Sequence, residues 1–120
     1  MKTDLFGKPV VNAIYTAEAS AQRRIRMTLS AAAYAYEKEG VSIMSDEEFD
    51  TLAKEVRPDI DTGHPVLDNF FRTEFSTDTG MWIHAHPELY LVEQYYRVAM
   101  GLISKATYLK RTCVWKAHNR

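Results

Sequence analysis

The amino-acid sequence predicts an all-α protein, a small single domain of three to five helices that takes in the whole chain, residues 1–120. Three observations lead to this class. Apolar residues recur at intervals of three and four over long stretches, which is the spacing of one helix face. Runs of β-branched and aromatic residues, which favour strands, are few. Glycines and prolines fall between the periodic stretches, at Gly40, Pro58, Gly63, Pro65, Gly80 and Pro87.

The first long helix is expected over residues 17–39. Its apolar face is made of Ile25, Leu29, Ala32, Ala33 and Tyr36. The alanine-rich run AAAYAY favours a helix and lets a neighbouring helix come close. Arg23, Arg24 and Arg26 are expected mostly to face water. Gly40 stands where the helix should end, in the left-handed conformation that glycine adopts without strain.

A second helix is expected to begin after Ser45. Ser45 and Glu48 form a capping box, in which the serine hydroxyl accepts from the Glu48 amide and the Glu48 carboxylate accepts from the Ser45 amide. Asp46 and Glu47 add negative charge at the positive end of the helix dipole. Pro58 is expected to end the helix, because the residue before a proline resists helical angles. The apolar side of this helix is Phe49, Leu52, Ala53 and Val56.

Four later stretches complete the chain. A short helix is expected over residues 66–75, anchored by Leu67, Phe70, Phe71 and Phe75. A longer one should run from Pro87 to about Ile103, since proline is tolerated in a first helical turn. The run 81–83 is too short to assign. The stretch 106–115 mixes β-branched and aromatic residues, so a helix and an extended arm both stay open there.

Composition indicates a globular protein, with 46% apolar and 26% charged residues. No run of 18 apolar residues is present to cross a membrane, and the N-terminus has Asp4 and no long apolar core of a signal peptide. We therefore expect a cytoplasmic protein without a membrane partner. Cys113 is the single cysteine, which excludes an intramolecular disulfide and a multi-cysteine zinc site, and we expect an idle thiol.

Charge is segregated along the chain. Between Glu37 and Glu93 fourteen acids face four bases, whereas after Glu93 there are six bases and no acid. The C-terminal segment 105–120 combines bases with Tyr108 and Trp115, and such a mixture can contact phosphates and stack on nucleobases. A basic arm that docks on the acidic middle explains the pattern equally well. The bases concerned are Lys105, Lys110, Arg111 and Lys116.

The turn around Gly40 brings together aromatic and acidic residues. Tyr36 and Glu37 stand near the end of the first helix, and Asp46, Phe49 and Asp50 open the second. Asp46 and Asp50 are four apart and share one helix face, which Phe49 borders. Aromatic rings beside carboxylates can hold a planar cation, and the carboxylates can also accept hydrogen bonds from sugar hydroxyls or amides. These five residues are the predicted binding site.

The stretch YAYEKEGVSIMSDEEFD resembles the small N-terminal helical domain, domain Ia, of NAD-dependent DNA ligases. That family typically has a Tyr-His pair at a helix end, a short loop, an aspartate, and then Tyr-Asp. Tyr36, Asp46, Phe49 and Asp50 fall on these positions without a gap, and Glu37 stands where the family has histidine. The resemblance covers residues 20–57.

What the resemblance implies is a helical hairpin that binds the nicotinamide mononucleotide half of NAD. Tyr36 and Phe49 would contact the nicotinamide ring, and Asp46 and Asp50 would hold its charge, its ribose or its amide. The family's Lys-x-Asp-Gly motif is absent, and 120 residues cannot hold its nucleotidyltransferase domain. The protein is therefore not expected to be a ligase or another enzyme. A free-standing domain of this kind resembles small ligase-like accessory proteins of bacteriophages and prophages.

Other readings of these residues remain open. The hairpin can be a protein-interaction module that keeps the fold without the ligand, with its aromatics in the core. His84 and His86, with Asp78, Asp68 and His64, can be considered as metal ligands, but no metal is expected, because no zinc-enzyme framework such as HExxH accompanies them. No phosphate-binding glycine loop and no GxSxG nucleophile motif occurs either.

Overall fold

The all-α class is confirmed by a computed structural model of the chain, which describes residues 2–3, 9–10 and 16–118, with side chains described over 16–113. The helices are α1 (Ala17–Glu39), α2 (Asp46–Ala53), α3 (Pro65–Thr73), the 3-10 helix η2 (Met81–Ala85), α4 (Leu89–Ala99) and α5 (Lys105–His118). Two short strands, β1 (Lys2–Thr3) and β2 (Pro9–Val10), pair antiparallel. Within the described ranges, no helix has both the length and the apolar character needed to cross a membrane.

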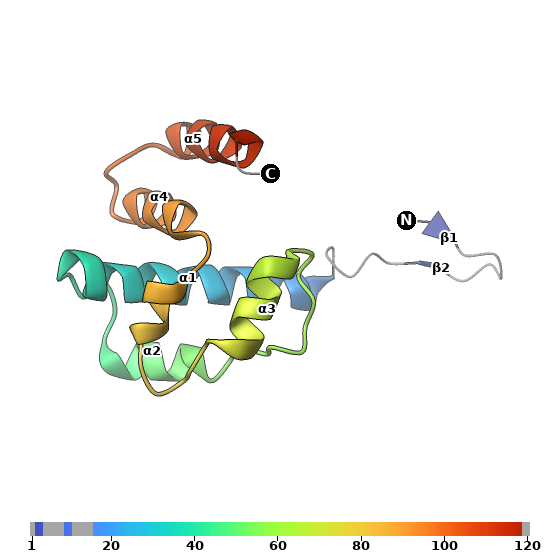
Figure 1. The fold of residues 1–120 in the computed structure, drawn as a ribbon, viewed down its shortest axis with the longest axis horizontal. Coiled ribbons are helices and arrows are strands. Elements are labelled where there is room, and N and C mark those ends of the chain that lie inside the picture. Colours follow the sequence, from blue (N-terminus) through green and yellow to red (C-terminus); the bar gives the residue numbers. More distant parts are fainter. Residues whose placement is uncertain (1, 4–8, 11–15, 119–120) are drawn as a thin grey trace.

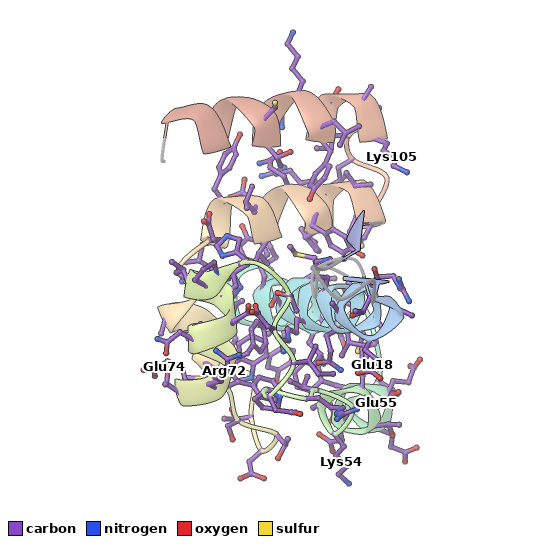
Figure 2. All side chains as sticks on the ribbon, turned by 90° about the vertical axis from the view of Figure 1, so that its right-hand side faces the viewer. Glu18, Lys54, Glu55, Arg72, Glu74 and Lys105 are labelled. Atoms are coloured by element: carbon purple, nitrogen blue, oxygen red, sulfur yellow. The ribbon has the colours of Figure 1, made fainter. Side chains whose placement is uncertain are left out.

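The long helix α1 is the centre of the molecule. α2 runs back alongside α1 as the second arm of a hairpin, while α4 lies on the opposite side of α1 and carries α5 on its outer side (Figure 1). Turned by 90°, α1 and α2 are seen end-on, whereas α4 and α5 are seen lengthwise, so the second helical pair crosses the first (Figure 2). α2 and the α4–α5 pair therefore cover different sides of α1 (Figure 1).

The expected bounds of α1 are confirmed at both ends. Thr16 caps the N-terminus, with its side chain accepting from the Ala19 amide at 3.0 Å. Gly40 adopts φ 67°, the left-handed conformation, and its amide bonds to the Ala35 carbonyl. The alanines Ala31, Ala33 and Ala35 are buried, so the small side chains let neighbouring elements approach the helix.

The capping box of α2 is also confirmed. The Glu48 amide donates to Ser45 Oγ at 3.1 Å, and the Ser45 amide donates to a Glu48 carboxylate oxygen at 3.0 Å. The helix ends at Ala53, however, and the expectation that Pro58 ends it is wrong. Gln22 of α1 accounts for the early end, because its side chain donates to the Glu55 carbonyl at 2.9 Å and accepts from the Arg57 amide at 2.8 Å. These bonds draw the backbone out of the helix before the proline is reached.

The expected bounds of α4 are wrong at both ends. The helix begins at Leu89, because Glu88 has the non-helical angles φ −128° and ψ 47° and is the N-cap, with its amide donating to Nδ1 of His86 at 3.0 Å. It ends at Ala99, because Gly101 adopts φ 71° and turns the chain, with the Leu102 amide donating back to the Arg97 carbonyl at 2.8 Å. The short run 81–83 belongs to η2, and the stretch 106–115 is helical rather than extended.

Aromatic rings make up much of the core beside α1. Phe70 and Phe71 of α3 pack edge-on at 5.3 Å between centroids, and Trp82 lies 5.8 Å from Phe71 and 5.1 Å from Phe75. Leu29, Ile83 and Val92 are fully buried and link α1, η2 and α4. The resulting core fixes the segment before η2 against the α1–α2 hairpin.

Arg26 is the clearest departure from the sequence expectation. Arg23 and Arg24 face solvent as expected, but Arg26 is only 4% exposed. Its guanidinium donates to Asp68 of α3 at 2.8 Å and to the carbonyls of Arg57 and Ile60 at 2.9 and 3.0 Å. The side chain thus joins α1 to α3 and to the loop that follows α2.

Candidate functional site

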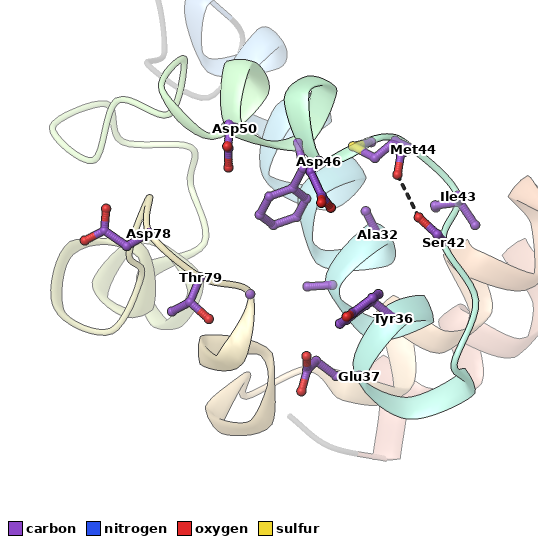
Figure 3. A pocket seen from close by; sticks show the side chains of 13 residues that line it. Ala32, Tyr36, Glu37, Ser42, Ile43, Met44, Asp46, Asp50, Asp78 and Thr79 are labelled. Carbon is purple, nitrogen blue, oxygen red and sulfur yellow. Dashed lines mark hydrogen bonds between the residues drawn. The ribbon is translucent and has the colours of Figure 1, made fainter.

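A cavity of about 340 Å³ lies at the α1–α2 turn (Figure 3). Its walls are the C-terminal end of α1, the loop that joins the two helices, the N-terminal half of α2, and the segment 78–80 that precedes η2. All five residues predicted from the sequence line this one cavity: Tyr36, Glu37, Asp46, Phe49 and Asp50. The structure therefore brings the predicted set together.

The two aromatic residues occupy different depths. Tyr36 is 65% exposed and stands at the rim, so it is not a core residue. Phe49 is half-buried. A Cβ placed on Gly80 would lie 3.7 Å from Phe49 Cζ and 3.4 Å from Ala33 Cβ, so the ring packs close to the Gly80 backbone. Phe49 thus joins the cavity to the core, while Tyr36 lies exposed at the rim.

The loop between the helices is tied down by its own hydrogen bonds. Ser42 Oγ donates to the Met44 carbonyl at 2.9 Å, and this bond is visible in Figure 3. The capping box at Ser45 then fixes the direction in which α2 leaves the loop. As a result Asp46 and Asp50, one turn apart on α2, point to the same side of the helix and into the same cavity.

The cavity is acidic. Four carboxylates line it, from Glu37, Asp46, Asp50 and Asp78, and no lysine or arginine is among its described lining residues. Like charges that converge on one hollow produce a local negative potential that concentrates cations. The arrangement is suited to binding a cation that also carries hydrogen-bond donors.

His84 of η2 supplies an imidazole next to this cavity. Its Nε2 lies 3.1 Å from Oε1 of Glu37, and the two side chains are 41% and 19% exposed. The contact holds the Glu37 carboxylate against η2. It also places an imidazole beside Glu37, which stands where the ligase pattern has histidine.

Sequence reasoning missed the wall made by Asp78, Thr79 and Gly80, and the neighbouring His84. Asp78 and His84 were considered only as metal ligands, because nothing in the local spacing connects residues 78–84 with the turn around Gly40. The connection is made by tertiary packing, through the aromatic core that holds η2 against α1. A sequence pattern limited to one hairpin contains no signal for it.

The alternative metal set is dispersed in the structure. Asp68 is engaged by Arg26, His84 contacts Glu37, and the His86 ring packs 5.0 Å from the Phe70 ring. His84 lies within the 3-10 helix, whereas His86 follows its end, so the strand geometry that would align them does not occur. Over the part of the chain that the structure describes, no group of three or more His, Cys, Asp or Glu side chains could hold a metal ion.

Among the side chains that the structure describes, the bases of the C-terminal segment do not form one stripe. Arg111 faces α4 and donates to Gln94 Oε1 at 3.0 Å. Lys105 and Lys110 are exposed, but five helical positions separate their directions by about 140°. Trp115 and Lys116 lie beyond residue 113, where the description of side chains ends. The single cysteine, Cys113, is exposed.

Comparison of the chain with protein-family models, with curated proteins and with solved structures found no match. The likeness to ligase domain Ia therefore depends on the residues quoted from the sequence.

Proposed function

We propose that the protein is a small, non-catalytic accessory protein whose acidic cavity binds the nicotinamide end of NAD or of nicotinamide mononucleotide. One observation carries the proposal. Tyr36, Glu37, Asp46, Phe49 and Asp50, chosen from the sequence for their likeness to ligase domain Ia, line a single cavity of about 340 Å³. A bacteriophage-type ligase-like protein is the kind of accessory protein that this likeness favours.

The chemistry of the cavity supports an oxidised nicotinamide ring as the ligand. That ring is a planar cation, and cations bind favourably over the faces of tyrosine and phenylalanine. The four lining carboxylates add Coulomb attraction and can accept hydrogen bonds from the carboxamide and the ribose hydroxyls. The volume is at the lower end of the range for small-molecule sites, which suits a nucleoside better than a whole dinucleotide.

The phosphate of the ligand belongs at the open side of the cavity. Four carboxylates repel a phosphate, and Glu37 replaces the histidine that the ligase family has at this position. The imidazole of His84 lies beside this carboxylate, with its Nε2 3.1 Å from Glu37 Oε1, and hydrogen-bonds to it. The ring and the ribose, rather than the phosphate, therefore supply the binding energy, and nicotinamide riboside should bind at least as tightly as the mononucleotide.

Calorimetry with nicotinamide mononucleotide and with its reduced form tests the proposal, because reduction removes the ring charge and leaves the size almost unchanged. We expect the oxidised form to bind at least roughly tenfold more tightly, which is about 1.4 kcal/mol. Asp46→Asn and Asp50→Asn should each weaken binding. Glu47→Gln is the matched control, since Glu47 is an exposed acid of the same helical turn that does not line the cavity. The absence of any heat of binding at millimolar nicotinamide mononucleotide would contradict the proposal.

A second candidate uses the same cavity to bind an arginine side chain of a partner protein. It is favoured by the four converging carboxylates without a lining base and by the exposed ring of Tyr36, since guanidinium groups bind both carboxylates and aromatic faces. A short capped peptide with arginine, compared with the same peptide with uncharged citrulline, separates this function from nucleotide binding. Binding of the arginine peptide together with no response to nicotinamide nucleotides would select the interaction module.

A further inference from the structure

A second cavity, of about 380 Å³, lies toward the N-terminal half of α1. Its walls come from α1, from the segment that leads into α3, from the region around the start of α4, and from α5. It has no lining residue in common with the acidic cavity at the α1–α2 turn. Its chemistry can therefore be considered on its own.

The charge at this second cavity is positive. No aspartate or glutamate is among its described lining residues, whereas Arg23 and Arg26 both are. Arg26 is compensated by Asp68 at 2.8 Å. Arg23 donates to the Thr62 carbonyl and to Ser20 Oγ, both at 3.0 Å, and among the described residues it has no carboxylate within ion-pair distance. One uncompensated guanidinium thus stands at the cavity, held in place by neutral acceptors.

A buried imidazole adds a neutral donor. His86 lines the cavity and is 6% exposed. Its Nδ1 accepts from the Glu88 amide at 3.0 Å, so in the neutral ring the proton is on Nε2, which has no hydrogen-bond partner among the described residues. Burial, and secondly the neighbouring His64, lower the pKa of His86 to about 4, which keeps the ring neutral at pH 7.

Tyr108 of α5 supplies a second neutral donor. It lines the cavity, and its hydroxyl has no hydrogen-bond partner in the described part of the protein. Burial, followed by the neighbouring Tyr95, raises the pKa of Tyr108, so the hydroxyl keeps its proton. Apolar side chains provide much of the remaining wall, among them Met27, Leu67 and Leu109.

We infer that this second cavity binds a small carboxylic acid with an apolar body, such as a medium-chain fatty acid or an aromatic acid. The carboxylate pairs with the Arg23 guanidinium and accepts from His86 Nε2 or from the Tyr108 hydroxyl, while the apolar body packs against Met27, Leu67 and Leu109. Hydrogen bonds between charged partners are the stronger kind, so Arg23 supplies the selectivity for an anion. A cavity that is mostly apolar with a few convergent polar groups is the usual form of a small-molecule site.

Octanoate is the probe, with octan-1-ol and octylamine as neutral and cationic analogues of the same chain length. In a titration followed by amide and imidazole NMR signals, octanoate should bind saturably at sub-millimolar concentration and shift the ring signals of His86. Arg23→Gln should weaken binding roughly tenfold, about 1.4 kcal/mol, and Tyr108→Phe should weaken it severalfold. Arg24→Gln is the matched control, because Arg24 is the adjacent exposed arginine and lines neither cavity.

Three outcomes would overturn the inference. They are no saturable binding at millimolar octanoate, equal binding of the alcohol or the amine, and equal weakening by Arg23→Gln and Arg24→Gln. Asp46→Asn at the other cavity should leave octanoate binding unchanged, so the result does not depend on the proposed nucleotide site.

Discussion

At the scale of single residues, the buried pair of Arg26 and Asp68 is the main polar feature of the interior. Burial alone would raise the pKa of Asp68, but hydrogen bonds from Thr62, at 2.6 and 3.0 Å, and from Arg26 outweigh it, so the pKa of Asp68 is lowered. Arg26 was predicted to face water because periodicity counts apolar residues only. A charged residue on the buried face of the helix, such as Arg26, is therefore not detected by that pattern.

Asp68→Asn should reduce the free energy of unfolding by about 3–5 kcal/mol, because it leaves the Arg26 charge buried without its counter-charge. Urea unfolding at pH 7 measures the change. Asp59→Asn is the control, since the Arg57–Asp59 pair is 3.5 Å long with side chains 58% and 70% exposed, and such pairs contribute at most about 1 kcal/mol. Equal losses from the two substitutions would contradict this account of the buried pair.

His86 should make the stability of the protein depend on pH. The pKa of His86 is lowered from 6.5 to about 4 in the folded protein, so between these values the unfolded chain binds more protons. The stabilisation by the neutral ring is complete above pH 6.5 and is lost as the pH falls toward 4, by at most about 3 kcal/mol.

The test is urea unfolding across that pH range for the wild type and for His86→Asn. Asparagine does not titrate, and its side-chain oxygen can still accept the Glu88 amide. The variant should be less stable at pH 7 and should show a flatter profile between pH 6.5 and 4. Parallel profiles for the two proteins would assign the pH dependence to other groups.

At the scale of the helices, what was predictable depended on how local the signals are. The end of α1 and the start of α2 follow from Gly40 and the Ser45 box, both within a few residues of the ends that they fix. The end of α4 also has a local signal in Gly101, which was overlooked, and the helix was extended too far as a result. The end of α2 depends on Gln22, which lies more than thirty positions away, so no local reading finds it.

Gly101→Ala tests the end of α4. At φ 71° an alanine is strained, and nothing lies within 4 Å of the added Cβ, so backbone strain is the only new term. We expect a loss of about 1 kcal/mol in thermal unfolding. Gly101→Asn should lose less, because asparagine tolerates the left-handed region better than alanine. An alanine variant as stable as the wild type would show that the left-handed conformation of Gly101 does not require glycine.

At the scale of the whole molecule, α1 carries two cavities of opposite character, an acidic one toward its C-terminal end and a positive one toward its N-terminal half. Three of the four acidic residues of the first, Glu37, Asp46 and Asp50, were predictable because a single hairpin brings them together. The wall formed by residues 78–80, and the whole second cavity, were not predictable, because they require α3, η2 and α5 to be placed around α1. Local patterns do not encode that placement.

Occupation of the two cavities should stabilise the protein additively, because they share no lining residue. Each ligand at one hundred times its dissociation constant should contribute about 2.7 kcal/mol. The free energy of unfolding, measured with nicotinamide mononucleotide, with octanoate and with both, checks the sum. A combined effect well below the sum would show that the two sites compete or are coupled.

The carboxamide of Gln22 pairs with the main chain as another peptide group would. It donates a hydrogen bond to the Glu55 carbonyl and accepts one from the Arg57 amide, two residues further along the chain. Position 22 therefore requires a side chain that can both donate and accept a hydrogen bond. Glutamate has the same shape, but it would place an oxygen instead of a donor against the Glu55 carbonyl. Leucine would leave both the Glu55 carbonyl and the Arg57 amide without their hydrogen-bond partner. In a Gln22→Glu variant the Arg57 amide should still exchange slowly with solvent deuterium, whereas the amides around Glu55 should exchange faster than in the wild type. Unchanged exchange around Glu55 would contradict this role of Gln22.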